Sequence, residues 1–536
     1  MSKEHGHTPV NGVSDERKGT VDLNVEPLDS DTNTPADTNR IDPEVDRTIS
    51  HCILKNGDQV RITWTLEEEA RIVRKLDILF LPIFALMFTW MAIDRTNVSG
   101  VLTSTFLQDT SMTHDQANTG VSLLWLGIVL LEIPSNIVLH RIGPHYWIPG
   151  QVITWGFIEV LQSQVTNAGG WYVARLFLGL AESGFIPGGL YTLSRWYAPD
   201  ELTKRTAVFF LGPSVSAAFG SLISAGALTL HGKGGLMGWQ WIFVICGVST
   251  IFVGVLALAL VPKSPYHTGN LFGGLIRVRG WLNEHEADIL TARQARRSDH
   301  HAAGSKLKIS WKDITDVLFH WATWPYLITC LSGLQSVNGL STWGTTIIKS
   351  LGFSSIRANL LNAPGSLLSA IFAIGLSATV DRYNRFGYPI LFAGVWTLAG
   401  LVALYSLPVQ SESSWSFYAA YLITQAAPGW QPINVTWLSR NFATPQKRAV
   451  AYAVYIGCSN LGGTYGNQVF RASDAPGYRN AWIACISLGA VWLAVTLLQI
   501  IAFKWANRRA ARASTQSWES EGAYNDGQGR KYRYYW

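Results

Sequence analysis

Residues 77–97 read DILFLPIFALMFTWMAIDRTN, an apolar run with an acid and a base close to its end. A bilayer core about 30 Å thick needs about 20 apolar residues in helical form, and this run is long enough to cross it. Asp94 and Arg95 lie inside the run, where a charge is costly unless it is paired or wetted. We therefore predict a membrane-spanning helix that carries functional charges.

The composition of the 536-residue chain agrees with a membrane protein. Hydrophobic residues make up 48% of the chain and charged residues 15%, whereas soluble domains carry about 25% charged residues. The five cysteines are scattered and have no metal-ligand or redox spacing. The sequence also has no nucleophile–base pattern of an enzyme. We expect no enzymatic activity, no metal, no cofactor and no nucleic-acid partner.

Eleven more apolar runs of similar length follow the first. They lie at about 119–139, 147–166, 171–194, 206–230, 240–261, 324–348, 358–380, 387–407, 416–438, 449–470 and 481–503. The third run is the weakest, because Glu159, Gln162 and Gln164 interrupt it. Six runs, a basic polar stretch and six more runs are the plan of a two-domain transporter built from repeats. We predict an all-α membrane protein with twelve transmembrane helices in two six-helix bundles.

The polar segments define the rest of the predicted organisation. We expect a disordered tail at 1–70, an N-terminal bundle at 71–262, a central loop at 263–321, a C-terminal bundle at 322–505 and a C-terminal tail at 506–536. The N-terminal segment lacks the basic start and following apolar run of a cleaved signal peptide, so we expect none. Basic residues in the short loops favour cytoplasmic termini and a cytoplasmic central loop. We expect a monomer in the plasma membrane.

The segment before the first run has a helix-start pattern. Thr65 and Glu68 have the spacing of a capping box. Acidic residues at 67–69 suit the positive end of a helix dipole. We expect a short amphipathic helix on the inner membrane surface; the alternative is a charged linker.

The fourth run holds a second base and a second acid. Arg175 and Glu182 are seven residues apart, which places them on one helix face about 10 Å apart along the axis. Helix geometry places Arg175 at about the depth of Asp94 and Arg95, and Glu182 near the midplane. Two acids and two bases are therefore expected along one pathway.

The chemistry of these four residues suggests their roles. A carboxyl group shielded from water can gain and lose a proton near neutral pH, which suits Asp94 and Glu182 for proton coupling. Arginine stays charged and binds carboxylates through two hydrogen bonds, which suits Arg95 and Arg175 for an anionic substrate. The alternative is that the four residues form fixed salt bridges that hold helices together. The two roles can coexist, because a gate is often a breakable ion pair.

The second half has few charges inside its runs but many amides and aromatic residues. We select Gln335, Asn338, Trp343, Asn434 and Asn460 as residues that shape the rest of a substrate pocket. For each of them, hydrogen bonding between helices is the alternative role.

Five further residues are candidates for gating or structure. Glu132 lies deep in the second run, where Pro134 frees a backbone carbonyl and kinks the helix. Asp381, Arg382 and Arg385 gather in the loop after the eighth run. Such a cluster can latch one state of a carrier by pairing with a neighbouring helix.

Several short motifs match a known family. They are Arg74 to Asp77 with Leu81-Pro82, Asp94 to Asn97, Glu132 to Asn136, Arg175 to Pro187, Gly238 to Trp241, Asn460 to Gly463 and Asp474 to Tyr478. Together they resemble the major facilitator superfamily and, within it, the anion:cation symporters. The fungal allantoate permease group, with carriers for allantoate, nicotinate, pantothenate and biotin, looks most similar. The resemblance covers about residues 65–505.

The resemblance implies proton-coupled uptake of a small organic anion, such as a carboxylated vitamin, a ureide or a related metabolite, across a fungal membrane. In related symporters an Asp-Arg pair on the first helix and an Arg with a Glu two turns later on the fourth serve coupling and binding. Asp94, Arg95, Arg175 and Glu182 match those positions. The loop after the second run departs from the superfamily's Gly-x-x-x-Asp-Arg-x-Gly-Arg pattern, because its acid is missing. Two alternatives remain: an exporter of an organic acid or secondary metabolite, and a non-transporting nutrient receptor.

Overall fold

Helices dominate the part of the chain that the structure describes. The computed structural model describes residues 49–55, 58–197, 199–271, 276–278, 280–302, 310–407, 414–442, 444–474, 477–516 and 534. These residues belong to one compact unit.

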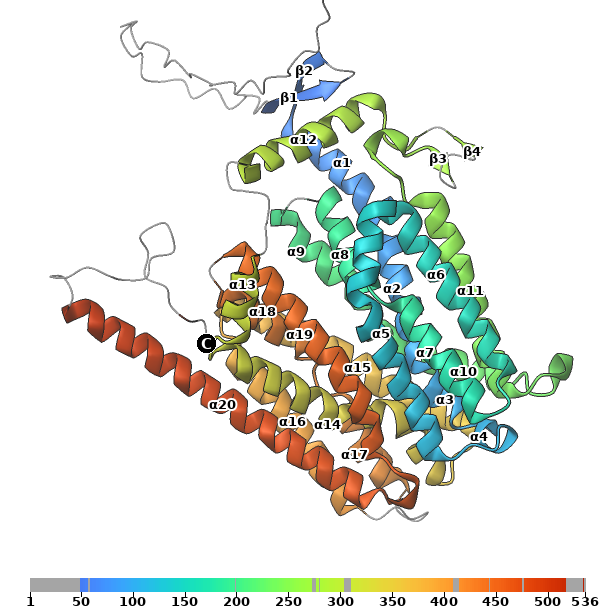
Figure 1. Ribbon diagram of the computed structural model, residues 1–536. Coiled ribbons are helices and arrows are strands. Elements are labelled where there is room, and N and C mark those ends of the chain that lie inside the picture. The colour runs from blue at the N-terminus through green and yellow to red at the C-terminus, as the bar shows by residue number, and fades with distance from the viewer. Residues whose placement is uncertain are drawn as a thin grey trace, which may run out of the picture. The chain divides into compact units, whose positions relative to one another are not determined.

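The N-terminal half contributes six membrane-length helical units (Figure 1). They are α1 (Leu66–Leu79) with α2 (Leu81–Thr96), α5 (His114–Ile142), α6 (Pro144–Leu161), α7 (Ala168–Glu182) with α8 (Phe185–Trp196), α9 (Pro199–Phe209) with α10 (Leu211–Leu228), and α11 (Gly238–Leu260). Two short helices, α3 (Val98–Val101) and α4 (Phe106–Asp109), follow α2.

The C-terminal half contributes six more units. They are α14 (Thr323–Ser350), α15 (Ser355–Tyr383), α16 (Gly387–Ser406), α17 (Ser414–Gln425) with α18 (Gln431–Arg440), α19 (Pro445–Gly466) and α20 (Arg479–Gln516). The predicted twelve-helix, two-bundle fold is therefore confirmed. Short 3-10 turns add Gln162–Gln164, Lys233–Gly235, Pro265–His267, Asn467–Val469 and Ala472–Asp474.

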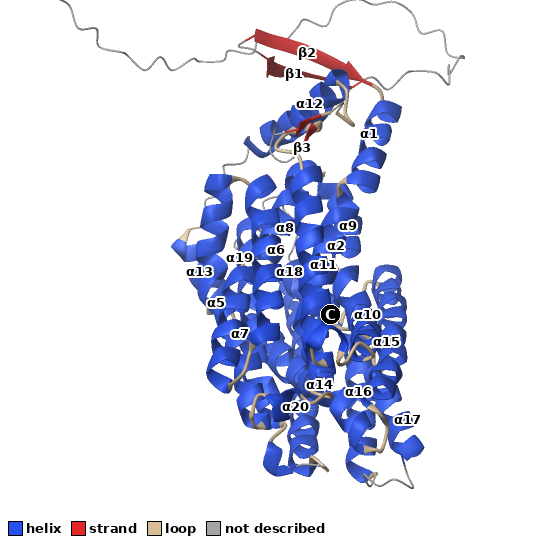
Figure 2. Ribbon diagram, turned by 90° about the vertical axis from the view of Figure 1, so that its right-hand side faces the viewer, coloured by secondary structure: helices blue, strands red, loops and turns tan. Residues whose placement is uncertain are grey.

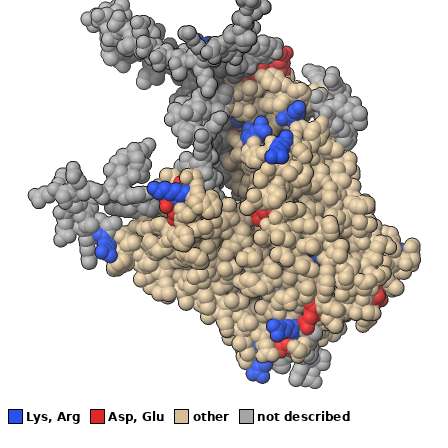
Figure 3. Space-filling model, in the orientation of Figure 1, with Lys and Arg blue, Asp and Glu red and all other residues tan. Residues whose placement is uncertain are grey.

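Two ends of the helical bundle are distinguished by the elements that lie there (Figures 1 and 2). The α12 end carries α1, α12 (Glu284–Ala302), α13 (Trp311–Leu318) and two hairpins, β1 (Ile49–Lys55) with β2 (Asp58–Trp64) and β3 (Asn270–Leu271) with β4 (Ile276–Arg277). The α4 end carries α3 and α4. On the face shown in Figure 3, charged side chains gather toward these ends and leave a mostly uncharged band between them. Such a band suits a hydrocarbon environment.

Three predicted boundaries need correction. Residues 1–48 of the predicted disordered tail lie outside the described residues, but Ile49–Lys55 and Asp58–Trp64 pair as the antiparallel strands β1 and β2, with Ile49 opposite Trp64. The predicted central loop contains α12 and α13. Helix α20 continues to Gln516, beyond the predicted end of the bundle at 505. Local hydrogen bonding and packing therefore order these polar segments.

Helix α1 begins with the predicted capping box. The backbone N–H of Glu68 donates to Thr65 Oγ1 at 3.2 Å, and the backbone N–H of Thr65 donates to Glu68 Oε2 at 2.9 Å. Only Phe80 separates α1 from α2, and Leu66–Val101 forms one 36-residue helical stretch. Helix α1 therefore runs on into α2 and packs against α12.

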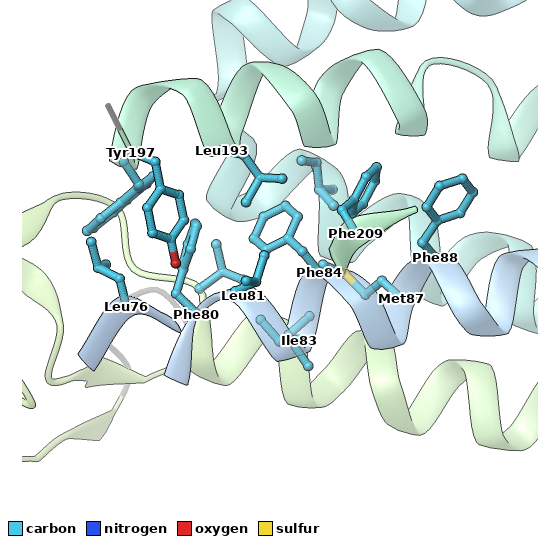
Figure 4. Close-up of a cluster of buried hydrophobic side chains, with 14 of the residues drawn as sticks. Leu76, Phe80, Leu81, Ile83, Phe84, Met87, Phe88, Leu193, Tyr197 and Phe209 are labelled. Atoms are coloured by element: carbon cyan, nitrogen blue, oxygen red, sulfur yellow. The ribbon is translucent and has the colours of Figure 1, made fainter. Parts of the chain in front are cut away.

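A row of aromatic side chains packs α2 against α8 and α9 (Figure 4). Phe80, Phe84 and Phe88 lie four residues apart and so share one helix face. The ring centroids of Phe88 and Phe209 are 4.6 Å apart. This packing fixes the first span, which carries Asp94 and Arg95 near its end.

The two halves meet along α10 with α15 and along α5 with α19. Toward the α4 end, Thr345 Oγ1 donates to the Ser99 carbonyl at 2.7 Å, and Lys349 Nζ donates to the Thr103 carbonyl at 2.6 Å. At the α12 end, ion pairs such as Arg205 with Asp77 join residues of the same half. Polar contacts between the halves are thus concentrated toward the α4 end.

Candidate functional site

Arg95 and Glu182 form a buried ion pair between α2 and α7. Arg95 Nε donates to Glu182 Oε2 at 2.6 Å. The Glu182 side chain is fully buried, whereas 14% of the Arg95 side chain is exposed. The guanidinium carbon of Arg95 also lies 5.2 Å from the ring centroid of Trp125 on α5. Arg95 thus presents an edge of the charged cluster to an accessible surface.

Asp94 points away from Arg95 and contacts a different helix. Its Oδ2 accepts a hydrogen bond from Thr250 Oγ1 on α11 at 2.8 Å. The carboxyl group is fully buried, and Oδ1 has no hydrogen-bond partner among the described residues. Consecutive helical residues point about 100° apart, which explains why the two neighbours have separate partners.

Arg175 is buried on α7 and is held by stacking. Its guanidinium carbon lies 4.3 Å from the ring centroid of Trp171, one turn earlier on the same helix. The Nε and Nη2 atoms have no hydrogen-bond partner among the described residues. Three buried acids, Glu159, Glu182 and Asp94, are close enough to act electrostatically on Arg175. A buried arginine with unbonded donors is suited to an anion.

The four predicted residues therefore belong to one buried charged cluster, but the direct ion pair joins Arg95 to Glu182 and not Asp94 to Arg95 or Arg175 to Glu182. Arg95 bonds Glu182 across two helices, while Asp94 and Arg175 interact through charge without a direct hydrogen bond in the described structure. Such a cluster can bind an anion at its arginines and a proton at its acids.

Glu159 on α6 is a fifth charged member that we did not select from the sequence. It is fully buried, and its two carboxylate oxygens accept hydrogen bonds from Asn97 Nδ2 and Gln162 Nε2. The sequence does contain a signal for Glu159, namely an acid inside the third apolar run. We interpreted that acid only as a reason to consider the run a weak membrane span. An intramembrane acid indicates function by default.

Glycines set the positions of two acids in the cluster. A Cβ on Gly156 would lie 3.0 Å from the Gly247 carbonyl, so α6 and α11 approach closely one turn before Glu159. Gly184, two residues after Glu182, has φ +77° and forms the turn between α7 and α8. A Cβ at Gly184 would lie 2.6 Å from Ser135 Oγ, so only glycine fits this turn without strain.

The five residues selected from the second half lie on three helices, α14, α18 and α19, and have different partners. Gln335 and Asn338 are hydrogen-bonded to each other at 3.1 Å on α14. Trp343 Nε1 donates to Asn118 Oδ1 across the halves at 2.9 Å. Asn434 is buried inside the C-terminal half and donates to the Tyr455 hydroxyl at 3.1 Å. These contacts give Trp343 and Asn434 hydrogen bonds between helices, the alternative role considered for them.

Asn460 links the second half to the gating candidate Glu132. Asn460 Nδ2 lies 3.4 Å from Glu132 Oε2, joining α19 to α5. Pro134 lies inside α5, as predicted, and Asn136 Nδ2 donates to the Glu132 carbonyl at 2.7 Å in this region. Glu132 therefore partners an amide of the opposite half.

The predicted charged loop is only partly a loop, because Asp381 and Arg382 belong to the last turn of α15 and only Arg385 follows the helix end. The side chain of Asp381 lies outside the described residues, and both Arg382 and Arg385 are exposed. Asn384 ends the helix in the left-handed conformation, and its Oδ1 accepts a hydrogen bond from Arg440 Nη1 at 2.9 Å. This contact lies within the second half, so the described state shows the loop bound to its own bundle.

Known proteins with similar sequences are transporters. An uncharacterized transporter of Schizosaccharomyces pombe is 28% identical over 446 residues, covering 83% of this chain and 85% of its own. A protein named putative tartrate transporter, of Agrobacterium vitis, is 28% identical and covers 63% of this chain and 71% of its own.

Solved structures show the same fold at low identity. A D-xylose–proton symporter superposes with a TM-score of 0.58 at 14% identity, covering 79% of this chain and 97% of its own. A bacterial homologue of the lysosomal transporter Spinster, in an inward-facing and occupied conformation, also gives 0.58 at 14% identity and covers 78% and 96%.

The family assignment rests on a match to a family model. Residues 84–467 match the family described as Major Facilitator Superfamily, which is more than half of the chain. The match spans both halves and includes the buried charges. This chain is a multi-pass membrane transporter and belongs to the Major Facilitator Superfamily.

Proposed function

We propose that this transporter is a proton-coupled symporter that imports a small organic anion by alternating access. The observation that carries the proposal is the buried Arg95–Glu182 ion pair, which lies beside Arg175 with its unbonded donors. Burying such an ion pair costs free energy, and losing one partner strongly destabilises the protein because the other charge stays buried and unpaired. It is therefore well suited to a switch in which a proton on the acid releases the arginine.

The substrate side of the switch consists of the two arginines. Arg95 has the partly exposed side chain, so it is suited to meet the anion first. Arg175 offers two donor atoms without hydrogen-bond partners among the described residues. Two arginines together can satisfy a carboxylate through bidentate hydrogen bonds.

The proton side consists of Glu182 and Asp94. In the pair with Arg95, Glu182 uses only Oε2, and its buried Oε1 has no partner among the described residues. Protonation of Glu182 removes its attraction for Arg95 and frees the guanidinium for the substrate. Asp94, bonded to Thr250, offers a second proton site in the same cluster.

The polar contacts between the halves suggest the direction in which the described state opens. We infer that the α12 end faces the cytoplasm, with both termini, and that the chain acts as a monomer in the plasma membrane. The hydrogen bonds of Ser99, Thr103 and Asn118 with the second half then close the outer end. In this conformation substrate would leave toward the cytoplasm.

The class of substrate is a carboxylate. The name putative tartrate transporter of the Agrobacterium vitis relative agrees with a carboxylated cargo. Amides of the second half, among them Asn338 and Asn460, are candidates for contacts with the uncharged part of the cargo. Carboxylated vitamins, ureides and small hydroxy acids share this chemistry.

Uptake in cells tests the proposal. Labelled tartrate, nicotinate, pantothenate and allantoate are supplied at acidic and at neutral external pH, with and without a protonophore. We expect at least one of them to accumulate, faster at acidic pH, and to lose its accumulation with the protonophore. Arg175→Ala should abolish binding of that anion.

The same assay separates the competing functions. An exporter predicts efflux of a preloaded carboxylate and no accumulation. A receptor predicts binding of the carboxylate to purified protein without flux into proteoliposomes. Either result would contradict proton-coupled uptake.

A further inference from the structure

We propose that Glu159 is a positioning residue that balances the charge of Arg175 without bonding to it, and so keeps the Arg175 donors available for substrate. The inference rests on the proposed function, because it assigns Arg175 to a carboxylate. It concerns α6, which none of the roles given above uses.

Glu159 is a buried counter-charge for Arg175 on the neighbouring helix. Both side chains are almost completely buried, in α6 and α7 respectively. Glu159, Glu182 and Asp94 all act electrostatically on Arg175, and of the three only Glu159 has both carboxylate oxygens bonded to amides. A buried arginine needs such compensation, because an isolated charge is costly in a low-dielectric interior. Glu159 supplies it while Glu182 is engaged with Arg95.

In the described structure Glu159 is hydrogen-bonded by two amides and has no hydrogen bond with Arg175. Asn97 Nδ2 donates to one carboxylate oxygen and Gln162 Nε2 donates to the other. Each oxygen of the Glu159 carboxylate therefore has an N–H donor that is supplied by an amide and not by an arginine. Asn97 lies three residues after Asp94, so α2 itself holds the Glu159 carboxylate.

The two arginines of the cluster therefore differ in their hydrogen bonds before an anion binds. Arg95 is bonded to its acid, so an anion must break an ion pair to reach it. Arg175 has its charge balanced by an acid that is held elsewhere, and its Nε and Nη2 keep no partner among the described residues. An anion at Arg175 gains hydrogen bonds without breaking any.

This arrangement predicts opposite effects for two substitutions at one hydrogen bond. Glu159→Gln removes a negative charge that competes with the anion, so substrate should bind more tightly and leave more slowly. Asn97→Ala releases the Glu159 carboxylate to bond Arg175, so substrate should bind more weakly. If the hydrogen bond were only structural, both substitutions would change the affinity for substrate in the same direction.

A first experiment needs no substrate and is therefore independent of the proposed function. The melting temperature of the purified protein in detergent is measured for wild type, Glu159→Gln, Arg175→Met and the double variant. We expect each single variant to melt several degrees lower and the double variant to recover part of the loss. If Glu159→Gln alone yields no folded protein, recovery of folded protein in the double variant supports the coupling.

A matched double-mutant cycle uses Glu182, which lies on the same helix as Arg175. Glu182→Gln with Arg175→Met should show weaker coupling, because Glu182 is bonded to Arg95. Additive effects of Glu159→Gln and Arg175→Met would overturn the proposal. So would a larger coupling with Glu182 than with Glu159.

A second experiment measures KM and kcat for uptake of tartrate, or of another carboxylate from the panel that wild type transports. We expect Glu159→Gln to lower KM about tenfold and to reduce kcat. Asn97→Ala should raise KM, and Glu159→Asp, which keeps the charge, should return both constants toward wild type. A shift of KM in the same direction for Glu159→Gln and Asn97→Ala contradicts the proposal. If no carboxylate is transported, the proposed function fails while the melting cycle still tests the Glu159–Arg175 coupling.

Discussion

Trp343 and Asn118 join the two halves of the transporter: Trp343 Nε1 donates to Asn118 Oδ1 at 2.9 Å. The same asparagine donates from Nδ2 to the Phe470 carbonyl at 2.8 Å. One buried side chain of α5 therefore binds two elements of the second half. Both bonds must break when the halves separate toward the α4 end.

Replacing Asn118 should favour opening of the α4 end. Asn118→Ala removes two hydrogen bonds of about 1 kcal/mol each between the halves. A cysteine at Thr345, which is buried beside Ser99, should then react about fivefold or more faster with a membrane-impermeant maleimide. The measurement is made with the native cysteines replaced.

The control for this variant is Asn434→Ala. Asn434 is also buried and hydrogen-bonded, but its partners Tyr326 and Tyr455 lie in its own half. Its replacement should leave the labelling rate unchanged. Equal rates in the Asn118 and Asn434 variants would show that the Asn118 bonds do not close this end.

Replacing Gly184 even by alanine should destabilise the protein. Its φ of +77° costs an ordinary residue about 1–2 kcal/mol, and an added Cβ would lie 2.6 Å from Ser135 Oγ. We expect Gly184→Ala to lower the melting temperature in detergent and to misplace Glu182, two residues earlier. Gly226→Ala, whose Cβ meets nothing within 4 Å, is the matched control and should melt like wild type. Identical melting of the two variants would refute the strain argument.

The contact between α1 and α12 should depend on pH. Lys75 Nζ lies 2.7 Å from Glu286 Oε1. Burial alone would raise the pKa of Glu286, but hydrogen bonds from Lys75 and from the Asn283 backbone hold it below the ordinary value of 4.5. A lowered pKa means that the ionised form stabilises the docked α12. This stabilisation is present above pH 4.5 and is lost as the pH falls through the lowered pKa.

Hydrogen exchange checks this pH dependence. After correction for intrinsic rates, protection of the α12 amides should fall in wild type as the pH drops below about 4. Glu286→Gln should show the low protection already at pH 7. Protection that is the same in both proteins across the range would contradict a role for the Lys75–Glu286 pair.

The sequence predicted the helices well because their signal is local. Twelve apolar runs and the Thr65–Glu68 capping box need only composition and spacing, and the structure confirms both. The β1–β2 hairpin was missed because the polar composition of 1–70 outweighed a local signal. Asn56-Gly57 between two alternating runs is a typical hairpin pattern.

Four of the five charged residues of the candidate site were predictable from the sequence, but their pairing was not. The spacing of Arg175 and Glu182 gives one helix face and an approximate depth, but it does not fix the rotation of α7 against α2. That rotation brings Glu182 to Arg95. It depends on helix packing, such as the close approach of Gly179 on α7 to the Leu124 carbonyl on α5. Glu159 joins the cluster for the same reason, through the packing of α6 with α11.

Replacing Glu182 should separate substrate exchange from proton-driven uptake. Glu182→Gln resembles the protonated acid permanently, so Arg95 stays free to bind the anion. We expect exchange of labelled for unlabelled carboxylate to persist, while uptake driven by a pH gradient falls at least tenfold. Asp94→Asn should show the same separation if both acids serve in coupling. Loss of exchange together with uptake would indicate a structural role for the acid.

Proton movement measured together with substrate is the most direct test of the central claim. Proteoliposomes that contain a pH-sensitive dye receive a pulse of the transported carboxylate, and internal pH and substrate are followed at once. We expect wild type to acidify the interior in proportion to uptake, and Glu182→Gln to exchange substrate with no acidification. Acidification by Glu182→Gln in the same proportion as by wild type would contradict the claim that a buried acid alternates between its arginine and a proton.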